Sequence, residues 1–191
     1  GGASMAGTGG SIRIRSGGSG VSSSGSLVAN TGDAPNSEGS GSILMSTGHS
    51  LSNDAGSINL LTGSSDSGAS GNIVLSVGHH SLGARHGGNI NIQSGSSTKM
   101  DGGNVTIRTG ASKTGPSGSM QLGTGNSGGS GSSGTISITS GSSHAGNTGS
   151  LSFSVGSSIF GRGGNVLLDG GLSDAGDGGN VVIIGGGSDT N

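Results

Sequence analysis

The sequence contains no cysteine, tryptophan or tyrosine, and only two phenylalanines among its 191 residues. Without cysteine there is no disulfide framework, no CxxC redox or zinc motif and no thiol nucleophile. The shortage of aromatic rings excludes a stacking platform for single-stranded nucleic acid. Charged residues make up 8% of the chain, the net charge is −2 and the basic residues are scattered. The sequence therefore predicts no nucleic-acid partner.

Long apolar runs and proline are also scarce. No stretch reaches the about 20 apolar residues that a membrane-spanning helix needs, so we expect no membrane span. Glycine is abundant, with 48 residues, but there are only two prolines and glycine does not recur at every third position. These two features exclude a collagen triple helix.

A short repeat accounts for the glycine. Its first glycine is position zero. Positions two and four are apolar, position six is small or β-branched, and position seven is glycine in all copies. Position nine is serine in ten copies. The copies, numbered 1 to 12, follow one another at intervals of 15 to 17 residues and start at Gly10, Gly25, Gly41, Gly56, Gly71, Gly88, Gly103, Gly118, Gly134, Gly149, Gly164 and Gly179.

The alternation over positions two to six is the period-two pattern of a strand with one buried face. Copies too short to fold alone become stable when they stack on their neighbours, as in solenoids. The sequence therefore predicts an all-β fold, a parallel β-solenoid of about twelve 15-residue coils, flattened to two walls. The array is expected to occupy residues 1–191 as a single domain, with both ends cut in mid-coil. The alternative is antiparallel, with two successive copies forming one hairpin.

Glycine and serine have expected roles in such a coil. Glycines at positions zero and seven would permit positive φ at the corners and let the backbone come close to the opposite wall. Serines at position nine would line the second wall and donate hydrogen bonds to the coil above or below.

Few residues qualify for a metal or modification site. His79, His80 and His86 lie close together in copy 5 and are candidate metal ligands, but no further ligand recurs beside them. The alternative is that they are surface polar residues on a bulged corner. Asn104 begins the only Asn-x-Ser/Thr sequon and is a candidate for glycosylation, or else a corner asparagine bonding along the stack. No serine has a recurring histidine and carboxylate, so we expect no enzyme and no cofactor.

Positions three and five would face outward, and aliphatic side chains occupy several of them: Val28, Leu44, Leu61, Val74, Leu167, Val182 and Ile184. An exposed apolar surface of this size is typical of an interaction face. Uncapped ends would expose strand edges that pair with another chain. The expected partners are therefore copies of the same chain, through end-to-end and lateral packing. Threonine occurs on this face only at Thr106 and Thr139, which counts against an ice-binding array.

Two runs carry a resemblance, Gly-Gly-Asn-Val-Thr-Ile-Arg-Thr-Gly at 102–110 and Gly-Ser-Ile-Asn-Leu-Leu-Thr-Gly at 56–63. They resemble coils of large secreted β-solenoids such as filamentous-haemagglutinin-like adhesins, although the copies here are shorter. In composition the chain is similar to Gly/Ser-rich repeat proteins of diatom and other algal cell surfaces.

The resemblance implies an extracellular or cell-surface location. It also implies a structural subunit or segment of a self-assembling filament or surface adhesive fibre, with no catalytic residues. The alternative function is a soluble ice- or glycan-binding module with a flat Ser/Thr-rich face, for which glycans or surfaces would be the partners.

Overall fold

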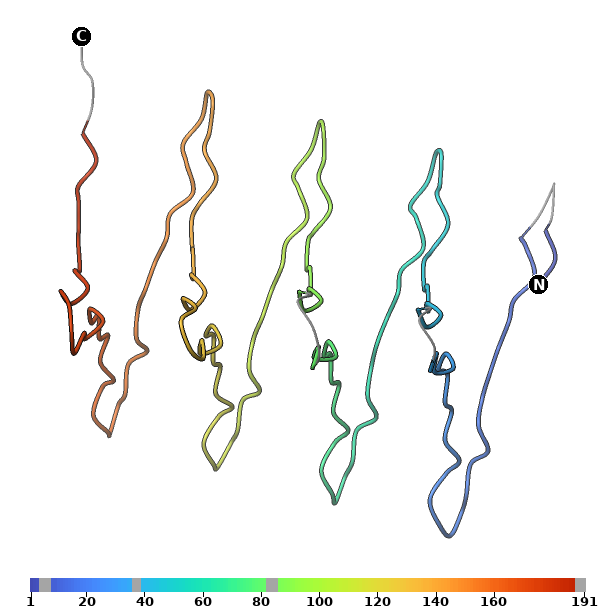
Figure 1. Ribbon diagram of the computed structural model, residues 1–191. Coiled ribbons are helices and arrows are strands. Elements are labelled where there is room, and N and C mark those ends of the chain that lie inside the picture. Colours follow the sequence, from blue (N-terminus) through green and yellow to red (C-terminus); the bar gives the residue numbers. More distant parts are fainter. Residues whose placement is uncertain (4–7, 36–38, 82–85, 188–191) are drawn as a thin grey trace. The chain divides into compact units, whose positions relative to one another are not determined.

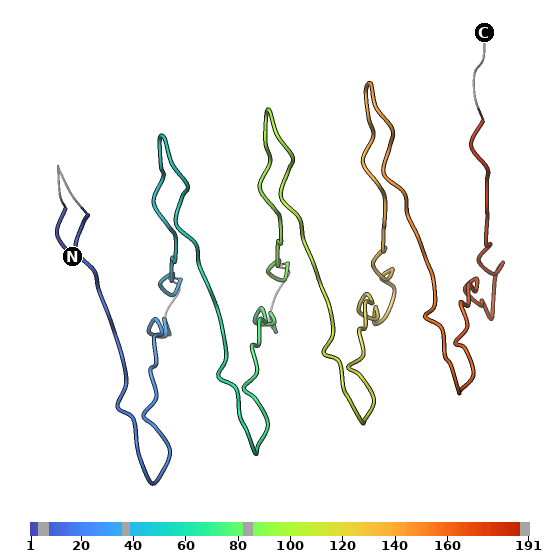
Figure 2. The same cartoon turned by 180° about the vertical axis from the view of Figure 1, so that it is seen from behind.

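The computed structural model describes residues 1–3, 8–35, 39–81 and 86–187. The chain divides into two units, Gly1–Ile92 and Gln93–Asn191. Neither unit contains a helix or a β-strand in its described residues. The trace consists of drawn-out segments separated by bends and narrow loops (Figure 1; Figure 2 gives the view from behind). We call the eight residues from position zero to position seven of a copy its segment, and the residues up to the next copy its loop.

The prediction of an all-β, parallel β-solenoid is wrong, because the described ranges contain no strand and therefore no ladder between coils. The antiparallel hairpin alternative fails for the same reason. Period-two alternation specifies two faces of an extended segment. A strand also needs hydrogen bonds to a neighbouring segment. The backbone–backbone bonds seen in the described part join residues eight positions apart along the chain, so they close loops instead of building a sheet.

Each of these bonds runs between two glycines of the repeat. The N–H of a position-zero glycine donates to the carbonyl of the position-seven glycine before it, and we call this closure the neck of the loop. The N···O distance is 2.9 Å from Gly25 to Gly17, Gly103 to Gly95 and Gly118 to Gly110, and 2.7 Å from Gly179 to Gly171. Gly10 and Gly2 form the same bond at 2.9 Å ahead of copy 1.

In copies 6 and 11 the position-zero glycine also lies close to the side chain at position six of the preceding copy. A Cβ on Gly88 would lie 2.6 Å from Cγ1 of Val77, at position six of the preceding copy. A Cβ on Gly164 would lie 2.9 Å from Cγ1 of Val155. At position seven, which is described in all twelve copies, no atom lies within 4 Å of such a Cβ. The expected close approach of the backbone therefore exists at position zero, but between neighbouring copies and not across a coil.

The expectation of positive φ at positions zero and seven is wrong. Among the described residues only Gly129, in the loop of copy 8, has a positive φ, at 73°. The physical reason is that most loops reverse the chain over several residues through a serine-centred turn. A gradual reversal of this kind needs no left-handed corner.

The position-nine serine builds that turn inside its own loop. Its Oγ accepts a hydrogen bond from the backbone N–H three residues later, an ST motif that we call the serine turn. The bond is found at Ser19, Ser50, Ser65, Ser97, Ser112, Ser143, Ser158 and Ser173, at 2.9–3.2 Å. The expectation that these hydroxyls donate to a neighbouring coil is wrong, because every bond they form among the described residues is an accepted bond within their own loop.

The loops of copies 2, 5 and 8 have a different construction. Copies 2, 5 and 8 are the ones longer than 15 residues, and they begin 46 and 47 residues apart at Gly25, Gly71 and Gly118. Position nine is Ala34 in copy 2 and His80 in copy 5, neither of which can form the serine turn. Copy 8 turns at Gly129. Copy 11, which would continue this series, has 15 residues and the ordinary turn at Ser173, so the series ends at copy 8.

No described side chain is buried, so the predicted columns of buried aliphatic residues are absent. The accessible surface is 19261 Å². A globular protein of 17.7 kDa would expose about 8,000 Å² when folded and about 26,000 Å² when unfolded. The alternation is still visible in the exposed fractions of the side chains. Position two is 50–65% exposed in copies 2–12, whereas apolar side chains at positions three and five are 71–87% exposed.

Candidate functional site

The described part of the chain offers no enclosed site. It contains no pocket. Its histidines and carboxylates form no group of three or more that could hold a metal ion. His79, His80 and His86 are therefore not brought together as a ligand set, and residues 82–85 between them lie outside the described ranges. Asn104 is exposed at position one of copy 7, and its glycosylation remains a prediction.

Membrane insertion through a helix has no support in the residues described. None of them belongs to a helix long and apolar enough to cross a bilayer.

The surface itself is the feature that recurs along the chain. We call the side chains at positions two and four the inner row, and the apolar side chains at positions three and five the outer row. All twelve segments lie within the described ranges, and their aliphatic side chains are open to solvent. Leu44 and Leu61 of the outer row are 87% and 84% exposed. Apolar surface exposed on this scale usually marks an interaction site.

Charge is nearly excluded from these segments. The chain has seven Lys or Arg and nine Asp or Glu residues. Only Arg13, Arg15, Arg108 and Asp169 fall within a segment, and the other charged residues lie in loops or at the C-terminal end. Depletion of charge from an apolar centre, with a charged and polar border, is the composition of a protein–protein interface core.

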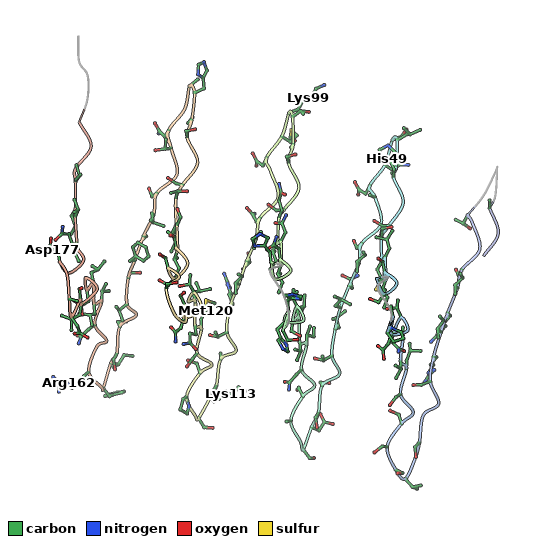
Figure 3. All side chains as sticks on the ribbon, in the orientation of Figure 1. His49, Lys99, Lys113, Met120, Arg162 and Asp177 are labelled. Carbon is green, nitrogen blue, oxygen red and sulfur yellow. The ribbon has the colours of Figure 1, made fainter. Side chains whose placement is uncertain are left out.

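Both lysines of the chain lie within serine turns. Lys99 lies in the turn made by Ser97 and Met100, and Lys113 in the turn made by Ser112 and Gly115. Figure 3 shows Lys99, Lys113 and Arg162 at loops, with their side chains directed away from the ribbon. Most charged residues therefore lie in loops, although the loops of copies 1, 8 and 9 contain none.

The outer row divides the copies into two classes. Copies 2–5, 11 and 12 carry exposed aliphatic side chains at position three or five, such as Val74 and Ile184. Copies 1 and 6–10 carry no aliphatic residue at these positions, as at Gln121 and Ser152. Every copy thus contributes to the inner row, and copies 2–5, 11 and 12 also contribute to the outer row.

Comparisons with protein-family models, with curated proteins and with solved structures found no match. Sequence reasoning missed the serine turns. Their signal was in the sequence, in the fixed place of serine two residues after the second glycine.

Proposed function

We propose that this chain is a structural protein, a subunit or segment of an extracellular filament or adhesive surface fibre that assembles from copies of itself. The observation that carries the proposal is that the aliphatic rows of all twelve segments are regular in sequence, yet no described side chain is buried. The role is non-catalytic. Its extracellular placement is supported only by the resemblance to secreted adhesins and algal surface proteins.

Burial energetics supports association as the means of assembly. Complete burial of one Leu, Ile or Val side chain stabilises by about 1.5–3 kcal/mol. In the free chain, side chains such as Leu44, Leu61 and Val74 obtain little of this energy, because each is at least 80% exposed. A second copy supplies matching rows of the same length and spacing. The free backbone N–H and C=O groups of unpaired segments can also bond to another chain.

The charged residues in the loops are expected to restrict unspecific aggregation. Charges that flank an apolar segment disfavour unspecific aggregation, because any misplaced contact buries an unpaired charge. Segments free of charge remain able to pack on one another. We expect ordered assemblies with the segments inside and the loops outside.

The test is sedimentation velocity of the 191-residue chain over a range of concentrations, with electron microscopy of the products. We expect species larger than the monomer, and elongated particles. A variant with Leu44→Ser, Leu61→Ser and Val74→Ser should associate more weakly, by about tenfold or more for each fully buried side chain lost.

A matched control changes equivalent polar positions in copies 8–10: Gln121→Ser, Ser137→Asn and Ser152→Asn. It should associate like the unmodified chain. A chain that stays monomeric at every concentration refutes the proposal, and so does equal association of the triple serine variant and the unmodified chain.

A further inference from the structure

The loop of copy 6 holds an Asp-Gly pair between its serine turn and its neck. The Met100 N–H donates to Ser97 Oγ at 3.0 Å and ends the turn, and the Gly103 N–H closes the neck. Asp101 and Gly102 are the two residues that link these hydrogen bonds. A change in the length of this link therefore changes the distance between the turn and the neck.

The loop of copy 11 has the same arrangement. The Gly176 N–H donates to Ser173 Oγ at 3.0 Å, and the Gly179 N–H closes the neck. Asp177, labelled in Figure 3, and Gly178 form the link. The link therefore has the same length and the same two residue types in both loops.

An Asp-Gly pair can rearrange its own backbone. The glycine nitrogen attacks the side-chain carboxyl carbon of the aspartate and forms a cyclic succinimide, while the carboxyl hydroxyl and the N–H proton leave as water. Water then adds to the ring carbonyl that belonged to the backbone, and the bond from this carbonyl to the glycine nitrogen breaks. The product is isoaspartate, which has the same atoms but one additional methylene in the backbone. Glycine favours the attack because it has no Cβ to obstruct it.

The links of copies 6 and 11 are accessible for this reaction. Asp101, Gly102, Asp177 and Gly178 are all exposed. No hydrogen bond found among the described residues is donated by the N–H of Gly102 or Gly178. An aspartate side chain readily approaches a backbone N–H that follows it closely. The reacting nitrogen and carboxyl group can therefore meet without breaking another contact.

A third Asp-Gly pair, Asp169 and Gly170, lies at the end of the copy 11 segment and is more constrained. Gly170 is half-buried, and a Cβ on it would meet the carbonyl group of Gly179. Cyclisation requires the glycine nitrogen to turn toward the aspartate carboxyl carbon, and a backbone packed in this way restricts that movement. The three pairs are identical in sequence, but the structure gives them different reactivities.

We propose that Asp101 and Asp177 are sites of spontaneous isomerisation to isoaspartate, and that this modification opens the neck beside each of them. The added methylene lengthens the link between the serine turn and the neck. The N–H groups of Gly103 and Gly179 then move away from their carbonyl acceptors. Self-assembly is not needed for either step, because the reaction takes place within one loop.

The first test is incubation of the chain at physiological temperature and near-neutral pH, followed by mapping with endoproteinase Asp-N. This protease cleaves before aspartate but not before isoaspartate. We expect resistance to develop first at residues 101 and 177, and more slowly at Asp169. Asp54 occupies the same position thirteen in copy 3 but is followed by Ala55, so it should remain cleavable. Resistance at Asp169 that develops as fast as at the other two residues overturns the proposal, and so does the absence of isoaspartate at either of them.

The second test is amide hydrogen exchange of the incubated chain, measured by NMR. Protection of the Gly103 and Gly179 amides should be lost in proportion to the isoaspartate formed. The Gly118 amide closes an equivalent neck, but Pro116 and Ser117 form its link and cannot isomerise, so its protection should persist. Gly103 and Gly179 amides that remain protected after isomerisation overturn the proposal, as does equal loss of protection at Gly118.

Three variants of copy 6 separate isomerisation from other changes during incubation. Asp101→Asn forms the same succinimide with release of ammonia, a better leaving group, so protection of the Gly103 amide should be lost faster. Asp101→Glu keeps the charge but lengthens the side chain, which disfavours cyclisation, so protection should persist. Gly102→Ala should slow the reaction and leave the neck closed, because its Cβ would lie 3.7 Å from the Gly95 carbonyl oxygen, an ordinary contact. Loss of protection in Asp101→Glu at the rate of the unmodified chain overturns the proposal.

Discussion

The loop neck gives the most direct test of the structure, because two glycines of one neck differ sharply in the space around them. A Cβ on Gly179 would lie 3.0 Å from the backbone nitrogen of Gly171 and 3.6 Å from its carbonyl oxygen. A Cβ on Gly171 would have no atom within 4 Å. Neither residue has a positive φ, so backbone conformation does not favour glycine at either site. We expect Gly179→Ala to open the neck and Gly171→Ala to leave it closed.

The expected magnitude follows from the contacts. Forcing an added methyl group into an occupied site costs about 1–3 kcal/mol. Here the obstructing atoms belong to the backbone and cannot move aside like the end of a flexible side chain. The hydrogen bond from the Gly179 N–H to the Gly171 carbonyl, at 2.7 Å, contributes about 0.5–1.5 kcal/mol. The strain therefore matches or exceeds the bond, and the closed population should fall by about 5- to 150-fold.

Amide hydrogen exchange measured by NMR reports the population of the closed neck. Protection of the residue 179 amide is calculated relative to its intrinsic rate in an unstructured peptide, which removes the direct effect of the side chain. Protection should be lost in Gly179→Ala and kept in Gly171→Ala. Equal protection in both variants, or greater loss in Gly171→Ala, would show that the neck is not closed in this way.

Two further predictions concern the loops. Ser112→Ala removes the acceptor of the Gly115 N–H, so it should destabilise that turn by about 0.5–1.5 kcal/mol and speed hydrogen exchange of the Gly115 amide. Ser112→Thr keeps the hydroxyl and should keep the protection of this amide. An unprotected Gly115 amide in the unmodified chain would contradict the turn. Gly129→Ala should strain the loop of copy 8 by about 1–2 kcal/mol, because φ is 73° there, and should shift the HN–Hα coupling at residue 129, with Gly128→Ala as the unstrained control.

The repeat positions read from the sequence mark the residues that form the local structure. The glycines at positions zero and seven are the two ends of each observed neck. The serine at position nine is the acceptor of each observed serine turn. What the sequence analysis inferred about their roles was wrong. Glycine at position zero serves close approach to position six, as at Gly88 and Val77, and serine bonds within its own loop.

The fold class could not be derived from the alternation. A pattern such as Val105, Ile107 and Thr109 makes one face of an extended segment apolar, and this is a property of the segment alone. Stacking into a solenoid depends on whether a second segment lies at hydrogen-bonding distance, and that is a non-local question. The described segments make no such ladder, and Ile107 remains 65% exposed.

The candidate interaction surface was easier to anticipate than the fold. Aliphatic side chains at positions three and five, and the absence of a recurring catalytic arrangement, already pointed to association between copies.

The sequence by itself determined what is encoded within about one repeat: the necks, the serine turns and the division between apolar segment and charged loop. These features need only contacts between residues close along the chain, so the order of residues fixes them. Only the tertiary structure decided that the aliphatic rows have no partner within the described chain. Burial requires two surfaces to meet, and the free energy of bringing them together depends on distant residues or on another molecule.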